Sequence, residues 1–214
     1  MRKRFDEQLS QMNAMVAHMG ELCETSIVNA TKALQNGNIE LAKEVMEEDD
    51  LIDQTEREIE HLCLNLLMQQ QPVARDLRQI SAALKMITDL ERIGDQASDI
   101  AEIIVSAGMS EATDFPKIVE MSREALRMVT WSVKAFLDKD LELAAEVRES
   151  DDVVDSMYDS VKAQLFDYIG ENQSEGAHRA IDLIMIAKYL ERIADHATNI
   201  AEWVEYAITG VHEG

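Results

Sequence analysis

The sequence predicts an all-α fold of two tandem, pseudo-symmetric three-helix bundles, with six long helices in total. The composition favours helix, because the 214 residues include only two prolines and eight glycines, and aromatic residues make up 5%. Apolar residues recur every three or four positions over long stretches, which is the helical period. The pattern of the first half also returns about 100 residues later. Together these features indicate a duplicated helical unit.

Three helical patterns, separated by turn signals, fill the first half. The first covers residues 4–35 and stops at 36–38, where Asn-Gly-Asn tolerates a left-handed C-terminal cap. The second covers residues 39–67 and ends before Pro72, because proline disfavours helix in the residue that precedes it. The third covers residues 73–105. Each helix is expected to be about 30 residues long, or ~45 Å at 1.5 Å per residue.

Small and polar residues interrupt the periodicity near the middle of the chain. Residues 107–114 are therefore expected to link a first bundle over residues 1–106 to a second bundle over residues 115–214. Pro116 fits the first turn of a new helix, with Asp114 as its cap or lead-in.

The second half repeats the acidic residues of the first as well as the apolar ones. Residues 40–45 match 142–147 at a shift of 102, and residues 90–102 match 190–202 at a shift of 100. The second half therefore lacks two residues, which we place in a turn near 172–174. A deletion in a turn, with the helices kept in register, is typical of a duplicated unit.

The charge of the chain bounds its partners. With 42 acidic and 20 basic residues, the formal net charge is −22. Such a field repels phosphate backbones and anionic lipid, which argues against nucleic acid as a direct partner. The negative charge can attract cations or basic protein surfaces. Alternatively, it serves only to keep long helices soluble.

Neither a membrane span nor a disulfide framework is predicted. No uncharged apolar run approaches the ~20 residues that a bilayer span needs, so direct membrane insertion is not expected. The basic start of the chain has no apolar segment behind it, unlike a signal peptide. Cys23 and Cys63 belong to no CxxC pair and are expected to be reduced, buried thiols of a cytosolic protein.

Acidic pairs at i, i+4 spacing are predicted to meet across two antiparallel hairpins. If the second and third helices turn back near Pro72, Asp53 and Glu91 each lie 19 residues from the turn. In the second half, Asp155 and Glu191 each lie 18 residues from a turn at residue 173. Residues at i and i+4 share a helix face, so four carboxylates can converge in each half if the helices are rotated suitably. The candidate metal ligands are Asp49, Asp53, Glu91 and Asp95, then Asp151, Asp155, Glu191 and Asp195.

Clustered carboxylates without matching bases are unfavourable unless they bind a cation, take up protons or splay into water. Oxygen ligands suit hard cations such as Mg²⁺, Ca²⁺, Mn²⁺ or ferric iron. A solvated acidic face is the alternative. Arg92 and Arg192 lie three residues before Asp95 and Asp195, where a surface ion pair contributes only a few tenths of a kcal/mol.

No catalytic residue is predicted, and the chain is not expected to be an enzyme. It has no glycine-rich phosphate loop, no GxSxG and no Cys/His nucleophile pattern. Glu58-x-x-His61 has the spacing of a di-iron ligand pair, but Ser and Ala stand at the repeated positions. We therefore treat His61, His178 and His196 as surface or packing residues.

Three segments give the chain its resemblance to a known family. They read QPVARDLR over residues 71–78, DLERIGD over 89–95 and YLERIADHA over 189–197. The chain resembles the PhoU family, the phosphate-transport accessory and phosphate-signalling proteins of bacteria, over its whole length. The resemblance implies two three-helix bundles with surface Glu/Asp-x-x-x-Asp motifs. In the family these motifs bind multinuclear iron or other metals such as zinc, manganese or magnesium, and all eight candidate positions above keep them.

The resemblance also implies a function. Family members are cytoplasmic, act at the inner face of the membrane through their partners, and are often homodimers. As non-enzymatic negative regulators they damp phosphate uptake and the phosphate-starvation response. They do so by linking the ATPase subunit of the phosphate ABC transporter to a sensor histidine kinase. The alternative is a carboxylate-bridged iron-binding protein, or a ferritin-like di-metal protein.

Overall fold

A computed structural model describes residues 2–69, 72–109 and 115–211, and within these ranges all regular structure is α-helical. The predicted fold class is confirmed. The helices are α1 (Arg2–Asn36), α2 (Ile39–Gln69), α3 (Ala74–Ser106), α4 (Pro116–Asp138) and α5 (Leu141–Thr209).

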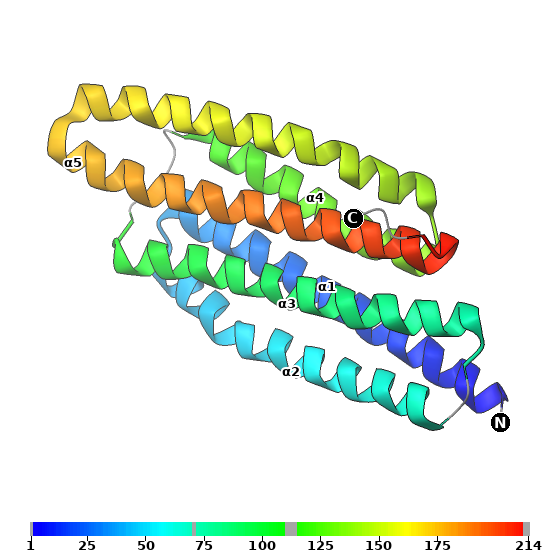
Figure 1. Cartoon of the computed structure of the whole chain (residues 1–214). Coiled ribbons are helices and arrows are strands. Elements are labelled where there is room, and N and C mark those ends of the chain that lie inside the picture. Colours follow the sequence, from blue (N-terminus) through cyan, green and yellow to red (C-terminus); the bar gives the residue numbers. More distant parts are fainter. Residues whose placement is uncertain (1, 70–71, 110–114, 212–214) are drawn as a thin grey trace.

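The last helix, α5, folds back on itself (Figure 1, gold). We call residues 141–171 its first arm and residues 176–209 its second arm. With the two arms counted separately, the residues that the structure describes form the six expected helices. A non-helical turn was predicted near 172–174, whereas helical hydrogen bonding continues around this bend. The bend contains no proline, in contrast to the α2–α3 connection, where Pro72 has no N–H to donate.

The helices form two bundles that lie side by side. Helices α1, α2 and α3 contact one another, and α4 packs on α5. Between the bundles, α3 contacts α5 and α1 contacts α4. Helices α2, α3 and the two arms of α5 thus make a four-helix layer, with α1 and α4 behind it (Figure 1). We call the outer surface of this layer the front face.

The same turn begins the second helix of each bundle. Asn38 Oδ1 accepts a hydrogen bond of 3.1 Å from the N–H of Leu41, and Asp140 Oδ1 accepts one of 3.0 Å from the N–H of Leu143. Both acceptors are N-cap side chains. The residue before each cap is left-handed, with φ of 60° at Gly37 and 57° at Lys139. Pro116 occupies the first turn of α4, as predicted. The repeated helix boundaries are therefore encoded locally in both halves.

Apolar residues that repeat at helical spacing form the core. Met12, Met19, Met121 and Met128 are fully buried, and the free thiols of Cys23 and Cys63 are buried as predicted. Residues 110–114 of the predicted linker, including Asp114, lie outside the described residues, and the domain boundaries stay a prediction. None of the described helices combines the length and apolarity that crossing a bilayer requires.

Polar residues of α3 and of the second arm of α5 join the two bundles. Oδ1 of Asp89 lies 2.9 Å from Nδ1 of His196 and accepts a 3.2 Å hydrogen bond from Asn199. Ten residues further along α3, the side chain of Asp99 is hydrogen bonded to Tyr189. The partner's number falls as the α3 number rises, so the two helices run antiparallel.

Candidate functional site

The predicted ligands lie on the front face in two groups of four. The first acidic cluster comprises Asp49 and Asp53 of α2 with Glu91 and Asp95 of α3. The second acidic cluster comprises Asp151 and Asp155 of the first arm of α5 with Glu191 and Asp195 of the second arm. All four residues of the first cluster are half-buried, whereas Asp155 and Asp195 of the second are exposed.

Carboxylates of α2 and α3 are close enough to perturb one another. Burial and then the charges of Asp95 and Asp53 together raise the pKa of Asp49 to about 6. The pKa of Glu91 is raised by burial and then by the charge of Asp95. Both halves of the α2–α3 hairpin therefore contribute to one negative field.

The two arms of α5 create a similar field. Partial desolvation by neighbouring protein atoms and then the charges of Glu191 and Asp151 together raise the pKa of Asp195 to about 6. The pKa of Asp151 is raised by burial and then by the charge of Asp155. The four predicted residues of each half thus act on one another across a helix–helix seam.

Two hydroxyl groups, which the sequence analysis missed, support the clusters. The Ser98 side chain is hydrogen bonded to Asp49, and this contact lowers the pKa of the carboxyl group against the larger effect of burial. In the second half, Thr198 Oγ1 donates a 3.3 Å hydrogen bond to Asp151 Oδ1. The signal was present in the repeat, since residues 98 and 198 both carry a hydroxyl group three positions after a candidate ligand.

Gly94 allows α2 and α3 to approach closely beside the first acidic cluster. A Cβ atom at this position would lie 2.8 Å from Ile52 Cδ1 and 3.1 Å from Asp49 Oδ1. Only glycine leaves this space free without a shift of its neighbours. Ala194 stands at the repeated position and is fully buried, so the second seam accommodates a methyl group that the first does not.

Basic residues compensate the two clusters unequally. In the first, Arg92 lies 3.2 Å from Asp95 and 3.4 Å from Glu91, and Arg57 lies 3.7 Å from Asp53. These surface pairs are screened by solvent and contribute little to stability.

In the second cluster, Lys188 pairs with Glu191. Arg192 lies over the Tyr189 ring instead, 5.8 Å from its centroid, and forms no ion pair with Asp195 in the described part of the chain. The Arg92–Asp95 pair of the first half thus has no counterpart at Arg192 and Asp195 among the described residues.

The three histidines do not behave alike. His61 and His178 are exposed, in agreement with the sequence analysis. His196 has a side chain only 24% exposed and contacts Asp89 of the other bundle. Its interpretation as a surface or packing residue was incomplete, because the repeated position holds Gln96 and gave no sign of a polar partner.

The donor chemistry of both clusters suits a hard cation, but their side chains do not converge. Among the residues that the structure describes, no three His, Cys, Asp or Glu side chains form a group that could hold a metal ion. An open cavity of about 500 Å³ lies beside the second cluster, and its lining includes Glu149, Asp151, Asp152, Thr198 and Glu202. The acidic residues are thus gathered and in part desolvated, but in the described ranges they are not grouped closely enough to hold a metal ion.

A duplicated three-helix bundle with an acidic front face is the class of protein that this fold and site define. Residues 16–104 and residues 118–204 each match the PhoU domain. The chain belongs to the PhoU family.

Proteins of known name and structure are similar over nearly the whole chain. A phosphate-specific transport system accessory protein PhoU homolog of Clostridium acetobutylicum is 36% identical over 211 residues, which cover 98% of this chain and 96% of that protein. The crystal structure of PhoU from Pseudomonas aeruginosa has 34% identity and a TM-score of 0.91, covering 97% of this chain and 100% of that one.

A second crystal structure, of the phosphate transport system regulatory protein PhoU from Streptococcus pneumoniae, has 25% identity and a TM-score of 0.88. It covers 98% of this chain and 99% of that one. These comparisons confirm the family, the all-α duplicated fold and the assignment to accessory and regulatory proteins, which are not enzymes.

Proposed function

We propose that this protein is a negative regulator of phosphate uptake and of the phosphate-starvation response. It links the ATPase subunit of the phosphate ABC transporter to the phosphate-sensor histidine kinase. The observation that carries this proposal is the relationship to phosphate-transport accessory proteins, which spans both bundles and nearly the full length of each relative. The protein acts in the cytoplasm as a homodimer, at the inner face of the membrane through its partners.

Complementation tests the regulatory role. The gene is expressed in a Pseudomonas aeruginosa strain that lacks its own homolog and carries a reporter of the phosphate-starvation response. We expect repression of the reporter in phosphate-rich medium. The purified chain should also retain the transporter ATPase and the kinase in a pull-down. A reporter that stays fully active, with neither partner retained, would contradict the proposal.

We further propose that the two acidic clusters bind metal ions on the front face. Each cluster places four carboxylates of two adjacent helices in a shared negative field that few basic side chains offset. A bound cation would relieve this repulsion, and carboxylate oxygens are the ligands that Mg²⁺, Mn²⁺ and iron prefer. Asp49, Asp53, Glu91 and Asp95 would hold metal in the first half, and Asp151, Asp155, Glu191 and Asp195 in the second.

Calorimetric titration of the chelator-treated protein tests the metal sites. We expect binding of Mn²⁺, Zn²⁺ or anaerobic Fe²⁺, and loss of half of the sites in a variant with Asp49→Asn and Glu91→Gln. The Asp167→Asn variant, which removes an exposed carboxylate outside both clusters, is the control. Unchanged binding after substitution of all four residues of the first cluster would rule them out as ligands.

A further inference from the structure

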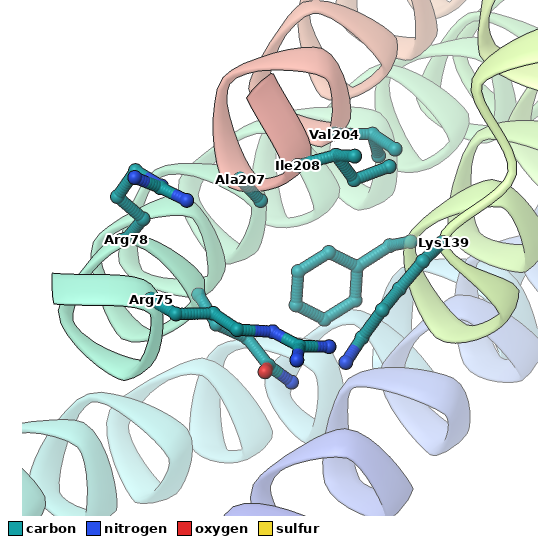
Figure 2. A pocket seen from close by; sticks show the side chains of 8 residues that line it. Arg75, Arg78, Lys139, Val204, Ala207 and Ile208 are labelled. Carbon is teal, nitrogen blue, oxygen red and sulfur yellow. The ribbon is translucent and has the colours of Figure 1, made fainter. Parts of the chain in front are cut away.

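A cavity of about 190 Å³ lies where the two bundles meet, at the opening turns of α3. Its lining comes from α3, from the C-terminal end of α4 and from the end of the second arm of α5 (Figure 2). At about 30 Å³ for each water molecule, it has room for roughly six waters. It is separate from both acidic clusters, and no step of the proposed function uses it.

The charge of this cavity is opposite to that of the chain. Its lining includes Arg75, Arg78 and Lys139, and none of its eight lining residues is acidic. In Figure 2 the guanidinium group of Arg75 and the ammonium group of Lys139 extend toward each other across the cavity. Both side chains are exposed, so water screens part of their mutual repulsion, and an anion between them would remove the rest.

No carboxylate of the described chain pairs with these three basic residues. The nearby acids are committed elsewhere, since Asp138 pairs with Lys134 and Asp140 caps the first arm of α5. Nε of Arg78 is buried and has no hydrogen-bond partner within the described residues. This atom is enclosed by protein, on a side chain that packs beside Gly210, so Arg78 adds positive charge to the lining rather than a hydrogen bond from Nε.

Apolar side chains form the rest of the cavity wall. Phe136 of α4 is one of the lining residues. Val204, Ala207 and Ile208 line the side formed by α5 (Figure 2). A few charged groups set in an apolar wall are typical of a small-ligand site. The planar fork of an arginine such as Arg75 matches the oxygens of a phosphoryl group, and three cations suit a dianion better than a monoanion.

We propose that this cavity, which we call the basic pocket, binds a phosphoryl group, either as free phosphate or as the phosphate end of a small phosphomonoester. Arg75 and Lys139 hold the anion from opposite sides, and Arg78 contributes its positive charge to the lining. Because the pocket is built from both halves, the ligand would fasten α3 to α4 and α5. Any ligand that binds only the folded state also stabilises it by mass action.

Calorimetry of the full chain in buffer with EDTA tests the proposal, because EDTA prevents a cation on the acidic clusters from binding phosphate instead. Orthophosphate and AMP are titrated separately, with acetate as the monoanion comparison. Saturable binding of orthophosphate identifies the free ion as sufficient, whereas binding of AMP alone identifies a monoester. Absence of binding for both, or equal affinity for acetate, overturns the proposal.

Two variants on different helices locate the site. We expect Arg75→Gln and Lys139→Asn each to weaken binding about tenfold, the effect of losing one charge-assisted hydrogen bond. Asparagine tolerates the left-handed backbone of residue 139, so this variant should fold. Lys32→Gln, which removes an exposed charge from α1, should bind normally. Full binding by both pocket variants would overturn the assignment, and it would leave the regulatory role and the metal sites unaffected.

Discussion

Asp89 and Asn199 are joined by a 3.2 Å hydrogen bond across the two bundles, although 110 residues separate them in sequence. In the repeat, Asp89 corresponds to Tyr189 and Asn199 corresponds to Asp99, at a shift of 100 residues. Tyr189 and Asp99 are also hydrogen bonded to each other. The same two helical positions therefore meet twice. The position that one half supplies in the first contact is supplied by the other half in the second contact. The second arm of α5 is held to α3 by polar pairs at two levels of the front face.

Removal of the Asp89 carboxylate should destabilise the folded chain. In Asp89→Ala, the half-buried His196 loses its partner and Asn199 loses its acceptor, so we expect the free energy of unfolding to fall by about 1–3 kcal/mol. Urea titration followed by circular dichroism measures this. Asp167→Ala, at an exposed position of the first arm of α5, is the control and should change stability by less than about 0.5 kcal/mol. An equal loss in both variants would show that the contact contributes nothing.

Gly94→Ala should also destabilise the protein, although alanine is the better helix former. Its Cβ atom would lie 2.8 Å from Ile52 Cδ1, and overpacking of this kind costs about 1–3 kcal/mol, against about 1 kcal/mol gained in helix propensity. Gly170→Ala is the matched control, because nothing lies within 4 Å of its added Cβ atom, and it should stabilise. Ile52→Val removes the clashing methyl group and should restore stability to the double variant. Equal effects of the two glycine substitutions would contradict the close approach of α2 and α3.

Protonation of the acidic clusters should stabilise the metal-free protein. The pKa values of Asp49 and Asp195 are raised from 3.8 to about 6 in the folded state, so the fold binds more protons than the unfolded chain between these limits. This stabilisation is complete below about pH 4 and is lost as the pH rises through 6.

We therefore expect Asp49→Asn or Asp195→Asn to raise the free energy of unfolding at pH 7.5 by about 1 kcal/mol, after allowance for solvent screening. The difference from the unsubstituted chain should shrink toward pH 4. Thermal denaturation in EDTA at a series of pH values measures it. A difference that is independent of pH would show that the two carboxylates ionise normally.

Thr198→Val should weaken metal binding by the second cluster and leave the first unchanged. The Thr198 hydroxyl orients Asp151, and loss of a partner that orients a ligand typically costs 10–100-fold in metal affinity. Ser98→Ala should have the reciprocal effect on the first cluster. Calorimetric titration measures the metal affinity of both clusters. In each variant, the unmodified cluster is the control for the modified one. Equal losses at both clusters in either variant would indicate a general disturbance of the fold.

Much of the fold could be predicted because it is encoded locally. The end of α1, the end of α2 and the start of α4 follow from Gly37, Pro72 and Pro116, residues whose backbone preferences act within a few positions. Counting from the hairpin turns placed Asp53 level with Glu91, and the structure brings them into one electrostatic field. Whether these residues bind metal stays a prediction.

The contacts between the bundles could not be predicted in this way. Asp89, Asp99 and Tyr189 lie among acidic and polar residues that, on a helical wheel, resemble a solvated face. Their partners are about 100 residues away, and no local pattern fixes which faces of two bundles meet. The basic pocket was missed for the same reason, because Arg75 and Lys139 belong to separate halves and only the packing of those halves brings them together.

The doubled contact between α3 and the second arm of α5 has the geometry of an isologous interface, in which each partner offers the surface that it receives. In most proteins such an interface joins two identical chains and depends on their concentration. Here both partners belong to one chain, so their association is intramolecular and proceeds at a high effective concentration. The protein is in this sense a covalently closed dimer of one three-helix unit. In a dimer of identical chains, one substitution changes both subunits. Here the two halves are separate stretches of sequence, so a substitution in one acidic cluster, or on one side of the basic pocket, leaves its counterpart unchanged.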